Sequence, residues 1–299
     1  MTSSGSHRLM PLLVCLLGSA LVVGGQAEDD AAKRITAGPF SVTAPAAWAD
    51  GVIVEKVPMS PVYDQRAWQE YQAAEAKRKI SPQEPAADLE PSYENRPEHW
   101  AIRFPKLALP GQHFAPKEAG GDPTAPQILI HKAVDWAGAY RDGSFDAAAS
   151  RKMTKKLRAM VEDRDPKKSP VFMDAELAFV AGRKKLRFSG GHGFRVLAQW
   201  NTEADFVRKG RLHYLFLGLS DDGSCQIVAT FPIDVPGLPE DSTREHLGFS
   251  TTSDDGFTKR FPKYERAVKE WLTANAAKAR PSLTELDAMM SSLDVRKWQ

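Results

Sequence analysis

Hydrophobic and polar residues alternate most regularly between residues 183 and 233, where four strand patterns follow one another with short links. The third pattern, "HYLFLGL" at 213–219, is largely apolar at both odd and even positions, so both of its faces are expected to be buried. Consecutive strands with short links are typical of an antiparallel meander. We therefore predict an antiparallel sheet over 183–233, with the 213–219 strand near its centre.

The rest of the chain adds shorter strand patterns and amphipathic helix patterns. Alternation predicts strands at 39–44, 51–57, 99–104 and 127–136. Helical spacing predicts helices at 64–80, 144–163 and 261–279, and a last helix that begins after Ser282, where Ser282 and Glu285 form a capping box. Proline- and glycine-rich stretches predict long loops at 81–97 and 107–126. These patterns together predict an α+β fold with a central antiparallel sheet flanked by helices, in a single domain over 28–299.

The N-terminal 27 residues have the layout of a secretory signal peptide. A short cationic start at His7 and Arg8 precedes an uncharged run from Leu9 to Val23, and small residues end the segment at Ala27. A membrane anchor is the alternative, but the run is short for a span of about 20 residues. We expect export to the periplasm or the outside of the cell, with no transmembrane segment after cleavage.

Composition narrows the classes of partner. The net charge of +2 is too small for a general nucleic-acid footprint, so no nucleic acid is expected as a partner. After removal of the signal peptide only Cys225 remains, which excludes an internal disulfide. Its place in the apolar segment "CQIVATF" favours a buried structural role over a reactive one, but does not decide it.

Two glycine-containing links in the meander are candidate sites. "SDDGS" at 220–224 carries two carboxylates, but a calcium loop would need further oxygen ligands, so a hairpin turn is the better interpretation. "GGHG" at 190–193 leads into a strand and not into a helix, which argues against a phosphate loop. His192 in this link could be a base or a binding residue, although a solvated side chain is the simpler interpretation.

Arg195 is the residue that most needs an explanation, because it lies among apolar neighbours in a predicted strand. A buried arginine must be paired with an acid or must face a ligand. We predict a binding surface on the meander that includes Arg195, Tyr214 and Trp200, with His192 as a further candidate. The partner would be an unknown protein or a small anionic ligand.

No sequence pattern points to a catalytic residue, a metal or a cofactor. The histidines lack metal-ligand spacing, and there is no nucleophile elbow or phosphate-binding loop motif. We therefore favour a binding or assembly protein over an enzyme. The alternative is a hydrolase of envelope or extracellular material, which would need His99, His131, His192 or His213 to meet Glu98, Asp221 or Asp222 in the fold. A third possibility is a structural component of an envelope assembly with an exposed apolar patch.

The chain resembles a family of uncharacterised exported bacterial proteins through two motifs. The first is Gly-x-Gly-x-Arg-x-Leu-x-Gln, carried by Gly191, Gly193, Arg195, Leu197 and Gln199. The second is Tyr-x-Phe-x-Gly-Leu-(Ser/Thr)-x-Asp-Gly, carried by Tyr214, Phe216, Gly218, Leu219, Ser220, Asp222 and Gly223. The resemblance implies export but transfers no catalytic residue.

A second resemblance is to the PsbP-like fold, whose members have an antiparallel sheet flanked by helices and mostly serve binding or assembly. "FSVTAPAAW" at 40–48 and "SLTELDAMMSSLDV" at 282–295 are similar to the start and the closing helix of that fold. The predicted loops at 81–97 and 107–126 depart from its compact pattern.

Overall fold

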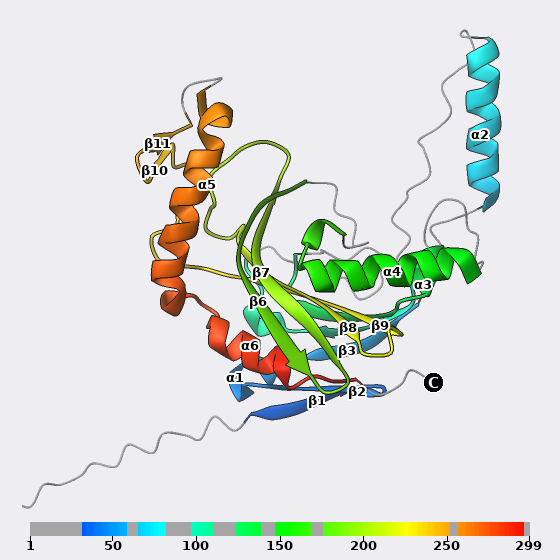
Figure 1. Cartoon of the computed structure of the whole chain (residues 1–299), viewed down its shortest axis with the longest axis horizontal. Helices are drawn as coiled ribbons and strands as arrows, with labels where there is room; N and C mark the ends of the chain where they lie inside the picture. Colours follow the sequence, from blue (N-terminus) through cyan, green and yellow to red (C-terminus); the bar gives the residue numbers. More distant parts are fainter. Residues whose placement is uncertain are drawn as a thin grey trace, which may run out of the picture. The chain divides into compact units, whose positions relative to one another are not determined.

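The computed structural model describes residues 32–58, 65–81, 97–110, 124–138, 147–168, 176–251 and 256–295. The predicted signal peptide and most of the two predicted loops lie outside these residues. The described chain combines helices with antiparallel strands, which confirms the α+β class (Figure 1).

Seven strands form the main sheet, in the order β3-β4-β5-β9-β8-β7-β6, and every neighbouring pair is antiparallel. The strands are β3 (Ile53–Val57), β4 (His99–Arg103), β5 (Gln127–Lys132), β6 (Glu176–Phe188), β7 (Gly191–Asn201), β8 (His213–Ser220) and β9 (Cys225–Pro232). The last four follow one another in sequence and in space, so the predicted meander is confirmed. All eight residues of β8 are buried, as its two apolar faces predicted.

Helices cover both faces of this sheet. On one face, α3 (Asp135–Gly138) and α4 (Ala147–Asp163) supply Trp136, Met153, Leu157 and Met160 to a core that they share with even-numbered residues of β7. The opposite face packs against α5 (Gly256–Asn275) and α6 (Leu283–Ser291). A further helix, α2 (Gln65–Ile80), confirms the pattern predicted over 64–80.

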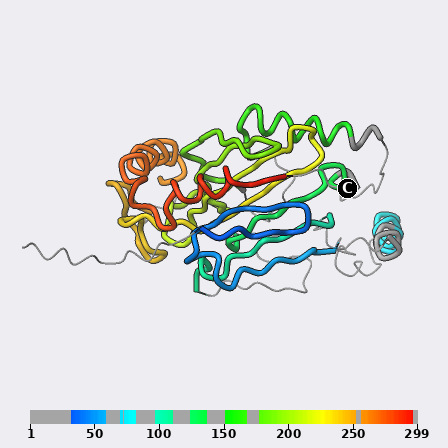
Figure 2. Tube along the Cα trace, turned by 90° about the horizontal axis from the view of Figure 1, so that it is seen from below, coloured from blue at the N-terminus to red at the C-terminus, as the bar shows by residue number. Residues whose placement is uncertain are grey.

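A small sheet adds to the α5 and α6 side. It has the order β1-β2-β12, with β1 (Lys33–Ala37), β2 (Phe40–Ala44) and β12 (Asp294–Val295). Because β12 pairs with β2, the last described residues lie beside the first strands, as the blue and red segments of Figure 2 show. Neither β1 nor β12 was predicted from the sequence, since each is short and weakly patterned.

The remaining described elements are short. They are the helix α1 (Ala46–Ala49), the strands β10 (Glu245–His246) and β11 (Phe249–Ser250), and the 3-10 helices η1 (Pro105–Leu107), η2 (Pro166–Lys168) and η3 (Ala276–Lys278). The capping box is confirmed in part, because the Glu285 amide donates to Ser282 Oγ at the start of α6. The predicted helix 261–279 is wrong at its start: α5 begins five residues earlier and includes Pro262, and the burial of Phe257 in the core favours the additional turn.

The "SDDGS" segment is a hairpin turn between β8 and β9. Asp222 Oδ1 accepts hydrogen bonds from Ser220 Oγ, from the Ser224 amide and from Ser224 Oγ, all within 3.0 Å. Gly223 has a φ of +75°, a conformation that glycine adopts at little cost. The other link is shorter than predicted: only Ser189 and Gly190 separate β6 from β7, so His192 belongs to the strand.

Candidate functional site

Arg195 and Tyr214 meet at one acidic residue of α6, Asp287. Arg195 Nε lies 3.3 Å from Asp287 Oδ1, and the Tyr214 hydroxyl donates to the same oxygen at 3.0 Å. Lys184 Nζ lies 2.8 Å from Asp287 Oδ2, and Arg195 also donates to the Gly182 carbonyl. Burial raises the pKa of Tyr214 well above its ordinary value, and the Asp287 charge raises it further, so the hydroxyl stays a donor. We call these five residues the Asp287 network.

The Asp287 network joins α6 to three neighbouring strands of the main sheet. The Arg195 and Asp287 side chains are only 13% and 7% exposed, whereas Lys184 is 54% exposed. A buried arginine with a carboxylate and a carbonyl as partners is satisfied without a ligand. Of the two explanations for Arg195 that the sequence left open, the geometry therefore matches structural pairing.

Trp200 and His192 lie on the opposite face of the sheet. Along β7, Leu197 faces the core of α5 and α6, whereas Phe194 and Val196 face that of α4. Since side chains alternate along a strand, Arg195 shares the side of Leu197, and His192 and Trp200 share the side of α4. The expected common surface of Arg195, Tyr214 and Trp200 is therefore not formed.

Of the histidines named for a hydrolase, His192 meets one of the named acids, Asp221, whereas His99, His131 and His213 lie on β4, β5 and β8 in contacts between rings. His99 and His131 pair across β4 and β5 with their ring centroids 4.7 Å apart, and the His213 ring packs against Trp200 at 5.5 Å. His192 Nδ1 lies 3.2 Å from Asp221 Oδ1, which is within reach of a hydrogen bond, and both side chains are largely exposed. Within the described ranges, no hydrogen bond joins His192 to a hydroxyl or a thiol.

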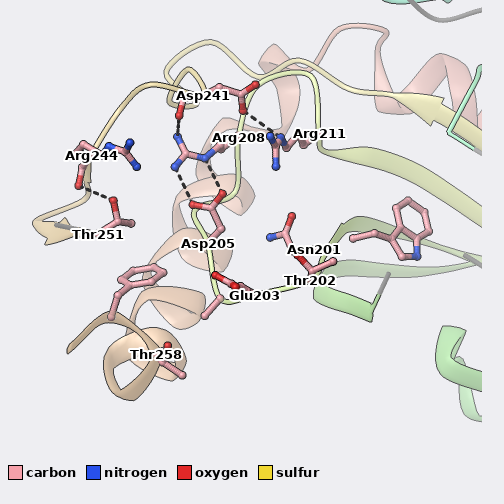
Figure 3. A pocket seen from close by; sticks show the side chains of 13 residues that line it. Asn201, Thr202, Glu203, Asp205, Arg208, Arg211, Asp241, Arg244, Thr251 and Thr258 are labelled. Atoms are coloured by element: carbon pink, nitrogen blue, oxygen red, sulfur yellow. Dashed lines mark hydrogen bonds and ion pairs between the residues drawn. The ribbon is translucent and has the colours of Figure 1, made fainter. Parts of the chain in front are cut away.

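A cavity of about 820 Å³ lies at the end of β7. Figure 3 shows its lining side chains, which come from the β7–β8 connection, from the loop that follows β9 and from the start of α5. They are residues 200–205, Arg208, Arg211, Asp241, Arg244, Thr251, Phe257 and Thr258. We call it the polar cavity. Trp200 is the only residue of the predicted surface that lines it.

Arg208 is the central support of the polar cavity, and its side chain is 3% exposed. Its Nε and Nη2 donate to the two carboxylate oxygens of Asp205 at 3.0 and 2.8 Å. Its Nη1 donates to the carbonyls of Glu240, Asp241 and Thr243 at 2.7, 2.8 and 3.1 Å. All three guanidinium nitrogens are thereby committed, and two connecting segments are held together.

The charges around Arg208 reinforce one another. Burial raises the pKa of Asp205, but the hydrogen bonds from Arg208 and from the Phe206 amide outweigh it, and the net shift is downward. The hydrogen bond with Asp205 raises the pKa of Arg208. Both groups are therefore charged at neutral pH and form a fixed ion pair in the wall of the cavity.

Arg244 differs from the other two arginines of the cavity. Arg211 Nε lies 3.0 Å from Asp241 Oδ1. The Arg244 carbonyl accepts hydrogen bonds from Thr251, but no ion pair joins its guanidinium to a carboxylate among the described residues. Sequence reasoning missed this site, although Asp205 and Arg208 three positions apart are a weak signal of a local ion pair.

His246 lies beside the polar cavity in a cluster of aromatic rings. Its Nδ1 is 3.1 Å from the Tyr264 hydroxyl, whose oxygen already accepts a hydrogen bond from the Val207 amide at 2.8 Å. A hydrogen bond from the Tyr264 hydroxyl to Nδ1 requires an unprotonated Nδ1 and is therefore compatible with the neutral imidazole. Burial lowers the pKa of His246, and the positive charge of Arg208 lowers it further.

We expect the free energy of unfolding to decrease as the pH is lowered below about 6.5, the ordinary pKa of histidine. His246 should cause part of this decrease. A lowered pKa in the folded state means that the unfolded state takes up the proton first, so protonation favours unfolding. Urea unfolding at about pH 7.5 and about pH 5.5 brackets this range. The His246→Phe variant should lose less stability between the two values than the unaltered protein. An equal loss in both proteins would contradict the assignment.

No helix among the described residues is long and apolar enough to cross a membrane. In the same part of the chain, no three His, Cys, Asp or Glu side chains come together as metal ligands. Comparison of the chain with models of protein families, with curated proteins and with solved structures finds no match.

Proposed function

We propose that the protein is an exported, non-catalytic binding protein that holds a small anionic ligand in the polar cavity. The observation that carries the proposal is the charge arrangement. Arg208 and Arg211 are neutralised by Asp205 and Asp241, whereas Arg244 lines the cavity without an acidic partner in the described part of the chain. A guanidinium in this position is suited to a carboxylate or phosphate group.

The other lining residues favour a polar ligand that also carries hydroxyl or ammonium groups. Glu203 lines the cavity with no ion pair to a described residue, so it can accept hydrogen bonds from such groups. Thr202 and Thr258 add hydroxyl groups, and Trp200 adds an aromatic surface. The volume of about 820 Å³ is within the range of small-molecule sites.

Thermal-shift measurements with paired ligands test this proposal. Each pair differs in one acidic group, for example glucuronate against glucose or glutamate against glutamine. A ligand at about one hundred times its dissociation constant adds roughly 2.7 kcal/mol of stability. We expect an acidic member to raise the melting temperature and its neutral counterpart to have a smaller effect.

Arg244→Gln should abolish the shift, because it removes the cation without changing the packed core. Arg266→Gln is the matched control, since Arg266 is an exposed arginine of α5 that does not line the cavity. Equal shifts with the two variants, or no shift with any acidic ligand, would refute the proposed function.

Hydrolysis remains a second candidate because of one observation, the contact between His192 and Asp221. A carboxylate that orients a histidine is one part of a nucleophilic or general-base site. If the protein hydrolyses ester, amide or glycoside substrates, His192→Ala should abolish that activity, while Arg244→Gln should not affect it. A hydrolytic activity that survives His192→Ala would exclude this pair as its source.

A further inference from the structure

One flank of α4 carries three cations without an ion pair to any described residue. Arg151, Lys155 and Arg158 follow one another at spacings of four and three, which places them on one side of the helix. All three are exposed, and none forms an ion pair with any residue that the structure describes. Like charges at this spacing destabilise a helix slightly, so the arrangement has a cost that a ligand would offset.

This flank is hollowed and lies beside the β8–β9 turn. A cavity of about 540 Å³ is lined by Arg151, Thr154, Lys155 and Arg158, with Val134 as an apolar wall. A Cβ placed on Gly223 would lie 3.2 Å from Arg158 Nη2, so this guanidinium lies beside the turn. The flank is thus a concave surface and not only a solvated helix face.

The side chains indicate the chemistry of the ligand. Arginine forms paired hydrogen bonds with phosphate oxygens, and lysine adds a point charge. Arg158 follows Arg151 by seven positions, or about 10 Å along the helix, which suits two linked phosphate groups or a headgroup better than one small ion. Glu162 also lines the cavity, so the positively charged part of the lining extends from Arg151 to Arg158.

We propose that the α4 flank of Arg151, Lys155 and Arg158 binds a phosphate-bearing ligand, either a soluble diphosphate or the headgroup of an anionic lipid. The site is separate from the polar cavity, with which it shares no lining residue. The proposal therefore stands or falls independently of the function proposed above.

Two double variants of the same helix test the proposal. Arg151→Gln with Arg158→Gln removes two cations from the flank. Lys152→Gln with Lys156→Gln removes two equally exposed cations of α4 that do not line the cavity, and is the matched control. Binding of pyrophosphate is measured by titration calorimetry. Binding to phosphatidylcholine vesicles, with and without phosphatidylglycerol, is measured by co-sedimentation. Circular dichroism confirms that each variant is folded.

We expect the flank variant to bind at least about tenfold more weakly, since each charge-assisted hydrogen bond contributes to affinity, and the control to bind like the unaltered protein. A loss confined to pyrophosphate identifies a soluble diphosphate as the source, and a loss confined to phosphatidylglycerol vesicles identifies a lipid headgroup. Equal losses in the two variants would show a diffuse electrostatic attraction and overturn the proposal. If neither pyrophosphate nor the phosphatidylglycerol vesicles bind, the proposal is also overturned. Binding that is lost with Arg244→Gln but not with the flank variant takes place in the polar cavity and would likewise overturn it.

Discussion

Asp287→Leu is expected to lower the free energy of unfolding by about 3–5 kcal/mol, the range measured when one partner of a buried ion pair is removed. The substitution leaves the Arg195 guanidinium buried without its carboxylate and leaves the Tyr214 hydroxyl without its acceptor. The lost contacts join α6 to the main sheet, so the effect should appear in global unfolding. Urea denaturation followed by tryptophan fluorescence measures it.

Three controls separate the buried pair from its surroundings. Lys184→Gln should cost less than about 1 kcal/mol, because this lysine is mostly exposed. Tyr214→Phe removes one hydrogen bond and should cost about 1 kcal/mol. The double variant Asp287→Leu with Arg195→Met should be more stable than the sum of the single effects predicts, since it removes both charges together. A loss of under about 1 kcal/mol for Asp287→Leu would contradict a stabilising role for this pair.

Arg208→Met should cost a similar amount, about 3–5 kcal/mol, for a related reason. It leaves the Asp205 carboxylate, which stays charged at neutral pH, without its cation. It also removes the donor to three carbonyls of the 240–243 loop. Because this loop forms one wall of the polar cavity, ligand binding should be lost together with stability. Chemical denaturation and the ligand-induced thermal shift are measured on the same variant.

Arg208→Lys tests the geometry of the pair separately from its charge. A lysine keeps the positive charge but cannot form the forked pair with Asp205 or reach the carbonyls in the same way, so we expect most of the loss to remain. Arg211→Gln is the matched control, because its pair with Asp241 is about half exposed and should contribute little. Full recovery of stability with lysine would show that charge alone, and not the hydrogen-bond geometry, holds the two segments together.

The sequence predicted the elements whose patterns are local. The meander, the burial of both faces of β8 and the hairpin turn at Gly223 follow from alternation and turn chemistry within a few residues. It was less successful with β6, which begins at Glu176 and not near residue 184. The pairing of β6 with β7 shifts register between Ala181 and Lys184, and Gly182 in this segment has a φ of +57°. The segment is therefore a bulge inside one long strand.

The candidate sites were predicted only in part. The sequence identified Arg195 as a residue that needs a partner. That partner, Asp287, is 92 positions away in the last predicted helix, and nothing near Arg195 in the sequence points to it. Trp200 was predicted to share a surface with Arg195 and Tyr214. In the structure it lines the polar cavity, which neither of those two residues lines. The cavity itself requires Asp205 and Asp241 to meet Arg208 and Arg211, which only the path of the connecting loops brings about.

By itself, the sequence determined the α+β class, the order of the four meander strands and the burial of both faces of β8, because alternation and helical spacing follow directly from side-chain burial. Only the tertiary structure decided that Asp287 neutralises Arg195, that Arg208 joins two distant segments and that Arg244 does not have an acidic partner among the described residues. Pairing between charges depends on distances of a few ångström between residues far apart in the chain. No local pattern records such distances, so the proposed function depends on the folded arrangement of the arginines.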